Sequence, residues 1–124
     1  MAAVDLEWER FDTLRAARKK FRQKPSLYAL VSEDGELLYV GESQDLWKRY
    51  NGGTGTAFDA ALDGTGKLVF ATTAPADRPM RLVVEAMLVY YHQPKFGIHN
   101  KRRAPRRSVE IEHHGDVPVP FRRH

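Results

Sequence analysis

Two tyrosines stand on either side of a predicted turn in the first half of the chain. Tyr28 and Tyr39 lie in short apolar runs, and Asp34-Gly35 between them is a hairpin turn signal. A two-residue loop places Leu30 opposite Tyr39 and Tyr28 opposite Gly41. Opposed residues share one face of a sheet, so the two phenols become diagonal neighbours beside a glycine. This pattern fits a pocket wall, although tyrosines are also ordinary strand residues that only pack.

Two charged residues could complete such a site. Arg49 lies one helical turn after Asp45, so it forms either a surface ion pair or a guanidinium turned toward the tyrosines. A guanidinium there would stabilise a phosphorane-like transition state. Glu85 is the single charged residue of the apolar stretch 82–91. Its burial needs compensation, either by Arg81 or by a divalent cation.

Together these positions resemble the GIY-YIG nuclease superfamily. Ser26-Leu27-Tyr28 stands where the family has Gly-Ile-Tyr, and Tyr39-Val40-Gly41 where it has Tyr-Ile-Gly. The stretch 41–49 follows the form Gly-x-Ser-x-Asn/Asp-Leu-x-x-Arg. Glu85 through Pro94 to Asn100 follows the closing segment of the family. The resemblance covers residues 26–100 and has five matched positions in order.

The resemblance implies a metal-dependent endonuclease that hydrolyses phosphodiester bonds, on an α+β fold with a small three-stranded antiparallel sheet flanked by helices. Glu85 would be the single protein ligand of Mg²⁺ or another divalent cation such as Mn²⁺. Tyr28 would be the general base or would position the nucleophile, with Tyr39 beside it. Arg49 would stabilise the transition state, and Asn100 would hold the site by hydrogen bonds. We expect the first four to converge on one concave surface next to Asn100.

The sequence departs from the family in two places. Ser26-Leu27 replaces the first Gly-Ile, and Gly53 stands four residues after Arg49, where the family commonly has His or Tyr. Tyr50 or His92 could fill that role. These departures keep open a catalytically weak GIY-YIG-fold module that only binds nucleic acid. A basic RNA-binding domain unrelated to nucleases is a more distant alternative.

Basic residues gather in two parts of the chain. Residues 101–124 hold seven Lys/Arg and three Asp/Glu and so supply the whole net charge of +4, and a second basic block lies between Thr13 and Ser32. Such blocks either bind a polyanion or form a solvated surface. We expect nucleic acid, and DNA in particular, to be the partner, read with low sequence specificity or by its structure. The candidate binding residues are Arg15, Arg18, Lys19, Lys48, Lys101, Arg102, Arg103, Arg106 and Arg107.

The 124 residues fit one domain. We expect an N-terminal helix packed on the domain within residues 1–25, a GIY-YIG-like domain over 26–100, and a basic C-terminal tail over 101–124. The predicted elements are a helix over Asp5–Gln23, strands over 26–32, 37–41 and 67–73, a short helix capped by Ser43, a loop with one helical turn over 51–66, a helix over 78–92, and a short edge strand over 108–112.

Composition excludes some chemistry. The chain has no cysteine, so disulfides, thiolate metal sites and cysteine nucleophiles are excluded. We found no signal-peptide core and no run long enough to span a membrane, and therefore expect a cytoplasmic protein with no membrane partner. The pair His113-His114 has no partner cluster in the tail, and we expect it to face solvent. The oligomeric state stays open.

Overall fold

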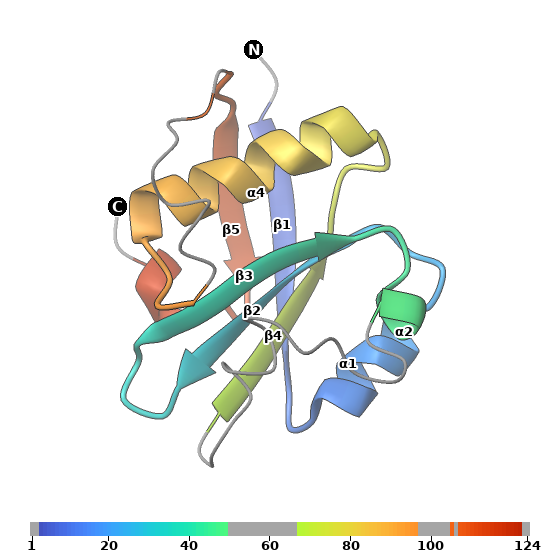
Figure 1. Cartoon of the computed structure of the whole chain (residues 1–124), viewed down its shortest axis with the longest axis vertical. Helices are drawn as coiled ribbons and strands as arrows, with labels where there is room; N and C mark the ends of the chain where they lie inside the picture. Colours follow the sequence, from blue (N-terminus) through green and yellow to red (C-terminus); the bar gives the residue numbers. More distant parts are fainter. Residues whose placement is uncertain (1–2, 50–66, 97–104, 106, 123–124) are drawn as a thin grey trace.

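A five-stranded sheet forms the centre of the computed structural model (Figure 1). The structure describes residues 3–49, 67–96, 105 and 107–122, with Arg49 and Lys67 described in their backbone alone. The strand order is β3-β2-β4-β1-β5. The described elements are β1 (Ala3–Phe11), α1 (Leu14–Lys20), β2 (Ser26–Ser32), β3 (Leu37–Ser43), α2 (Leu46–Arg49), β4 (Lys67–Thr73), α4 (Arg78–His92), β5 (Glu110–Gly115) and a 3₁₀ turn, η2 (Val119–Phe121).

The predicted small three-stranded antiparallel sheet is wrong. Strands β3, β2 and β4 do pair in antiparallel fashion, but β1 adds to β4 and β5 adds to β1 in parallel, which makes a mixed sheet. The predicted short edge strand over 108–112 is present as β5, two residues further along the chain. The basic C-terminal segment therefore contributes this strand to the sheet, next to β1.

The predicted helix over Asp5–Gln23 is also wrong in its first half, which forms β1. Leu6 and Trp8 are buried and alternate with the exposed Asp5 and Glu7, a period of two that fits a strand. The helix α1 begins only after Thr13, whose side chain accepts a hydrogen bond from the Ala16 N–H. The apolar spacing that suggested one long helix is shared between a strand and a short helix.

The hairpin between β2 and β3 has a longer loop than predicted. The Ser32 N–H donates to the Glu36 carbonyl at 2.9 Å, and Gly35 has a φ of 90°, so three residues form the loop. An irregularity between Leu30 and Val31 then shifts the register by one residue. The two deviations cancel. Tyr28 pairs with Gly41 and Leu30 with Tyr39, and the predicted register at the tyrosines is confirmed.

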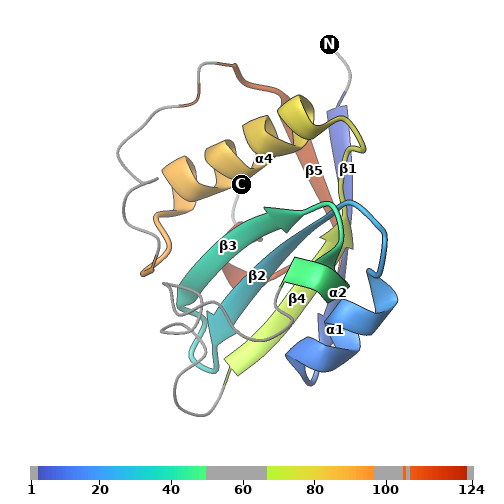
Figure 2. The same cartoon turned by 45° about the vertical axis from the view of Figure 1, so that its right-hand side comes forward.

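Each face of the sheet carries its own apolar cluster. On one face, Leu27, Ala29 and Val31 of β2 pack with Val84, Leu88 and Val89 of α4. On the other face, Tyr28 and Leu30 pack with residues of α1 and α2, including Phe21 and Leu46. Figure 2 shows α1 and α2 together at one end of the sheet, away from α4. The alternation along β2 thus separates the tyrosines from the buried side of α4.

The helix α4 has the predicted bounds and start. Asp77 caps its N-terminus by accepting from the Met80 N–H at 3.3 Å, and Pro79 lies in the first turn. After the helix, Lys95 and Phe96 donate backbone hydrogen bonds to β3, and Phe96 packs into the cluster that holds the tyrosines. The chain therefore passes around the outer edge of β3 to the tyrosine face. None of the helices in the described part of the chain is long and apolar enough to cross a membrane.

Candidate active site at the β3 edge

The two tyrosines lie together, as the hairpin register requires. The rings of Tyr28 and Tyr39 stack with their centroids 6.2 Å apart and an angle of 21° between their planes. The Tyr28 side chain is almost fully buried (1% exposed), whereas Tyr39 is half-buried. The more buried phenol is therefore covered on one side by the more accessible one.

Gly41 is required by the position of Tyr28. A Cβ atom at Gly41 would lie 2.3 Å from both Cζ and the phenolic oxygen of Tyr28. The Tyr28 phenol thus occupies the space that any other residue at position 41 would need. The glycine of the Tyr-Val-Gly segment has a steric function here, since it lets the phenol of the neighbouring strand lie across the backbone of β3.

The short helix α2 presents Arg49, and Asp45 fixes its start. The Asp45 carboxylate accepts from the Trp47 N–H at 3.1 Å and the Lys48 N–H at 3.4 Å. A hydrogen bond from the Gln23 N–H is the main cause that lowers the pKa of Asp45, and the α2 amides add to it. The helix cap is therefore Asp45. Ser43, which we predicted as the cap, instead accepts from the Asp45 N–H at 3.1 Å.

Arg81 does not take the role of counter-charge that one interpretation gave it. The Arg81 side chain is 1% exposed, and its Nε donates to a Glu42 carboxylate oxygen at 2.9 Å. Its Nη1 donates to the carbonyls of Pro75 and Ala76 at 3.1 and 3.2 Å. Thus the ion pair formed by Arg81 in the described part of the chain reaches across to β3.

Two contacts fix the alignment of α4 with β3. At the start of the helix, Arg81 bonds Glu42 near the end of β3. After the helix, the Lys95 N–H donates to the carbonyl of Leu37, at the start of β3, at 3.0 Å. The helix and the strand therefore run side by side in opposite directions (Figure 1).

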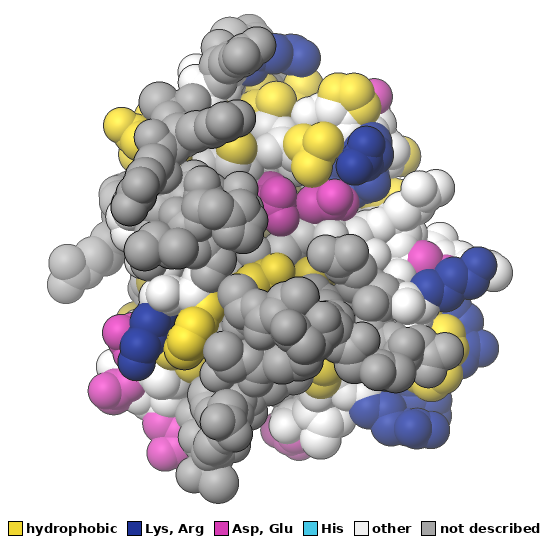
Figure 3. Space-filling view, in the orientation of Figure 1, with side chains coloured by type: hydrophobic (Ala, Val, Ile, Leu, Met, Phe, Trp, Pro, Cys, Tyr) yellow, Lys and Arg dark blue, Asp and Glu magenta, His cyan; other side chains and the backbone are white. Residues whose placement is uncertain are grey.

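With ideal helix and strand spacings, this alignment would bring Glu85 level with the Tyr39-Val40-Gly41 segment. Glu85 follows Arg81 by about one helical turn, or about 6 Å. That advance corresponds to about two residues of a strand, from Glu42 back to Val40. Acidic side chains gather between α4 and β3 on the surface in Figure 3.

The predicted convergence on a single surface is met only in part. Tyr28 and Tyr39 share one face of the sheet, whereas the buried side of α4 covers the other face. Glu85 belongs to α4 and is half-buried, so whether it reaches the tyrosines stays a prediction. The side chain of Arg49 and the whole of Asn100 lie outside the described residues, and their roles stay predictions.

A basic cluster lies next to α2. The guanidinium carbons of Arg15, Arg18 and Arg22 lie 5.8, 4.8 and 4.3 Å from the centroid of the Trp47 ring. We call these three arginines and Trp47 the arginine–tryptophan cluster. Lys and Arg side chains gather over α1 and α2 in Figure 3. Arg18 also donates to the carbonyls of Leu46 and Trp47, so it holds α2 in place besides carrying charge.

Arg22 belongs to the basic block noted between Thr13 and Ser32, but neither Arg22 nor Trp47 is among the candidate binding residues predicted from the sequence. The signal that could have found them is the run of basic residues at helical spacing before Pro25, opposite a second short helix with a tryptophan. Of the other candidate binding residues, Lys19, Lys48 and Arg107 are exposed. Lys101, Arg102, Arg103 and Arg106 lie outside the described residues.

Comparison with known proteins finds one distant similarity to report. No known family profile matches the chain. The chain is 28% identical over 107 residues to the UvrABC system protein C of Chelativorans sp. (strain BNC1). The match covers 75% of this chain but 16% of that protein, so the chain corresponds to a small part of its length. The similarity thus relates three quarters of this chain to one segment of a much longer protein.

Proposed function

We propose that this protein is a metal-dependent endonuclease of the GIY-YIG type that hydrolyses phosphodiester bonds in nucleic acid, with DNA as the expected substrate. The observation that carries the proposal is the buried Tyr28 phenol, which lies across Gly41 and stacks on Tyr39. It is the local arrangement that the matched Tyr28 and Tyr39-Val40-Gly41 segments require. The similarity to a segment of UvrABC system protein C is a second support, and we take the shared segment to be the same structural unit.

Tyr28 would act at the attacking water. Its phenolic oxygen has a fixed position, because the ring is held between the backbone of β3 and the ring of Tyr39. A phenol in a fixed position can orient a water molecule and accept its proton. Its unperturbed pKa is about 10, so a nearby positive charge must favour the phenolate for the base role. Tyr39, half-buried beside it, would line the path by which the phosphate approaches.

Glu85 would hold the divalent cation at the edge of β3. The residues present fit this role, since Glu85 is a half-buried carboxylate on α4, the helix that runs beside β3. Oxygen ligands of this kind suit Mg²⁺ or Mn²⁺. When bound, such a cation supplies charge neutralisation at the scissile phosphate and lowers the pKa of a bound water.

Arg49 would contact the phosphate from the side of α2. Its backbone lies in the last position of that helix, which Asp45 caps and Arg18 ties to α1. A guanidinium donates to two phosphate oxygens at once and so stabilises the charge that develops in the transition state. The arginine–tryptophan cluster next to α2 would hold the neighbouring phosphates of the strand.

The second candidate function is nucleic-acid binding without cleavage. The arginine–tryptophan cluster favours it, because three guanidinium groups around one indole bind a polyanion whether or not the tyrosine site is active. Gly53, at the position where the family commonly has His or Tyr, favours it as well. The two candidates differ in one measurable property, the cutting of the bound strand.

The deciding experiment incubates the full chain with single-stranded DNA, duplex DNA, flap DNA and RNA, with Mg²⁺ and with EDTA. We expect Mg²⁺-dependent cleavage of at least one substrate. In Tyr28→Phe cleavage should fall by about a hundredfold or more, since the proton acceptor is lost while the ring remains. Tyr91→Phe is the matched control, because Tyr91 is 63% exposed on α4. Binding of every substrate with no cutting of any would establish the binding module instead.

A further inference from the structure

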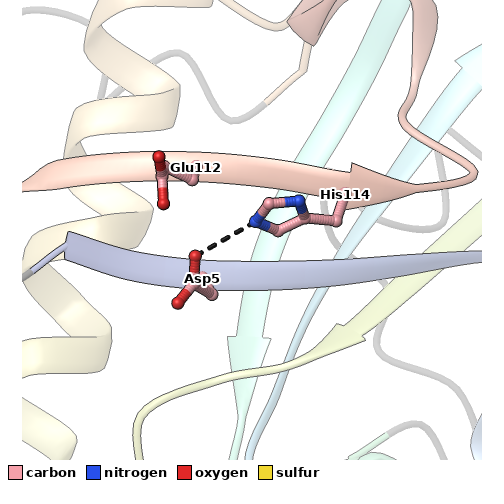
Figure 4. Close-up of side chains that lie close together, drawn as sticks. All are labelled: Asp5, Glu112 and His114. Carbon is pink, nitrogen blue, oxygen red and sulfur yellow. Dashed lines mark hydrogen bonds and ion pairs between the residues drawn. The ribbon is translucent and has the colours of Figure 1, made fainter.

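Three side chains with metal-binding groups meet at the opposite edge of the sheet from the candidate active site. Strands β1 and β5 pair in parallel, and Asp5 lies directly opposite Glu112 in the register. His114 follows Glu112 by two residues and so projects from the same face. Figure 4 shows the three side chains side by side, with the His114 ring turned toward Asp5. Nε2 of His114 and Oδ1 of Asp5 are 3.0 Å apart.

The spacing of the three side chains allows a common ligand. One donor atom from each of Asp5, Glu112 and His114 lies within 4.8 Å of the other two. The donors around a tetrahedral ion with bonds of about 2.0 Å lie about 3.3 Å apart. All three side chains are exposed, so rotation about their side-chain bonds can close the remaining distance. No backbone movement is required.

The strand register gives an independent reason to expect a cation there. Two carboxylates directly opposite each other on paired strands destabilise the pairing. Asp5 and Glu112 are such a pair, and the exposed Glu7 and Glu110 belong to the same two strands. The hydrogen bond from His114 engages Asp5 and leaves the charge of the opposing Glu112 in place. An ion held by both carboxylates would turn this repulsion into a cross-link between the strands.

We propose that Asp5, Glu112 and His114 bind a first-row transition-metal ion, with Zn²⁺ as the best fit. Two carboxylate oxygens and one imidazole nitrogen form a ligand set that zinc accepts, with water in the fourth position. The imidazole disfavours Mg²⁺, which takes oxygen ligands and keeps its waters. The site differs from the proposed Glu85 site in its edge of the sheet, its ligands and its metal.

The consequence of the bound ion would be structural. Trp8 and His113 already join the same two strands on the buried face, through a hydrogen bond of 2.8 Å from the indole N–H to Nδ1. The ion would tie the same strand pair on the exposed face. Arg107 and the basic residues before it precede β5 in the chain. An ion that fixes β5 would therefore also fix the point where the chain enters the sheet.

Zinc titration of the full chain tests the proposal. Calorimetry with ZnCl₂ should show one site on the background variant Glu85→Ala, in which the proposed catalytic ligand is absent. MgCl₂ should show no heat from this site. Co²⁺ in place of Zn²⁺ should give the visible absorption of a tetrahedral site. Thermal unfolding should shift to higher temperature as Zn²⁺ increases, since the ion binds the folded state.

Variants distinguish coordination of Zn²⁺ by these side chains from a general effect of negative charge. His114→Ala and Glu112→Gln should each lose most of the Zn²⁺ affinity and the Co²⁺ absorption. Glu7→Gln is the matched control, because it removes one negative charge from the same strand but no ligand, and it should keep both. Circular dichroism of each variant establishes that it is folded. Equal zinc binding in Glu112→Gln and the parent would overturn the proposal and establish Asp5–His114 as an ion pair only. Zinc binding no tighter than magnesium binding would overturn it too.

Discussion

The contact between Gly41 and Tyr28 leaves no space for one further methyl group. A Cβ atom at position 41 would overlap the phenolic oxygen of a ring that is 1% exposed and stacked on Tyr39. The ring cannot turn away without leaving a cluster that includes Leu30 and Ala71. A side chain at position 41 would therefore disturb the packing of the core and the position of the Tyr28 phenol together.

Gly41→Ala should accordingly lose cleavage activity and cost about 1–3 kcal/mol of unfolding free energy, the usual cost of overpacking a core. Urea unfolding and a cleavage assay on the same preparation measure the two effects. Gly35→Ala is the control. It strains a residue with a φ of 90° in the hairpin loop, far from the phenol, so it should lower stability while leaving activity per folded molecule unchanged. Full activity in Gly41→Ala would show that the Tyr28 position has no part in cleavage.

A substitution of Glu85 best distinguishes nucleic-acid binding from cleavage. Glu85→Ala should lower the cleavage rate by at least about a hundredfold, or about 3 kcal/mol, since the only protein ligand of the cation would be lost. Affinity for nucleic acid should stay the same or rise, because a negative charge near the phosphates is removed. A gel-shift and a cleavage assay compare it with Glu33→Ala, an exposed glutamate of the hairpin loop. Retained Mg²⁺-dependent cutting in a folded variant would exclude the ligand role.

At the scale of the elements, the short helix α2 depends on side chains from other segments. Four residues form too short a helix to be stable alone. Asp45 provides the N-terminal cap, and Arg18 of α1 donates to the carbonyls of Leu46 and Trp47, the first two residues of the helix. The backbone position of Arg49 in α2 is therefore set by side chains of other residues.

Asp45→Ala should lose about 1 kcal/mol of stability, which is the usual value of an N-cap. The pH dependence carries a second signature. The pKa of Asp45 is lowered below 3.8 in the folded state, so its ionised form stabilises the fold above about pH 4. That contribution is lost as the pH falls through the folded-state pKa. Asp45→Asn keeps a cap but cannot titrate, so unfolding curves between pH 2 and 5 should show a shallower loss of stability on acidification.

The sequence was sufficient for elements whose signal is local. The bounds of β2, β4 and α4 agree with the predicted runs. Each strand is a short, mostly apolar run, and Pro79 marks the first turn of the helix. The N-terminal segment failed because Leu6, Phe11 and Leu14 also fit helical spacing, and the strands that pair with it lie far along the chain. That error also concealed Asp5 as a neighbour of His114, which we had expected to face solvent.

In the candidate site, too, features set by neighbouring residues could be predicted, whereas features set by distant contacts could not. The tyrosine register could be predicted, since both strands belong to one hairpin. The side of the sheet covered by α4 could not, because the helix periodicity identifies a buried stripe but not the face that receives it. The alignment of α4 with β3 depends on the Arg81–Glu42 pair, whose partners are 39 positions apart.

At the scale of the whole molecule, charge should govern affinity separately from the site. Replacing Arg102, Arg103, Arg106 and Arg107 together by Ala should weaken binding and flatten its salt dependence by about 0.9 log–log units for each lost phosphate contact. The cleavage rate of bound substrate should not change. The measurement is binding affinity over a series of salt concentrations, with Glu33→Ala as the control. An unchanged slope would mean that this segment does not touch the phosphates.

The parallel pairing of β1 with β5 also affects how the sheet folds. Trp8 and His113 are 105 positions apart, and Asp5 and His114 are 109 apart, so this strand pair closes a very long loop. Loop closure of that length is entropically costly and slows folding. Until β5 pairs with it, the outer edge of β1 stays open. The charged residues Asp5, Glu7 and Glu9 along β1 would oppose pairing of that open edge with other chains.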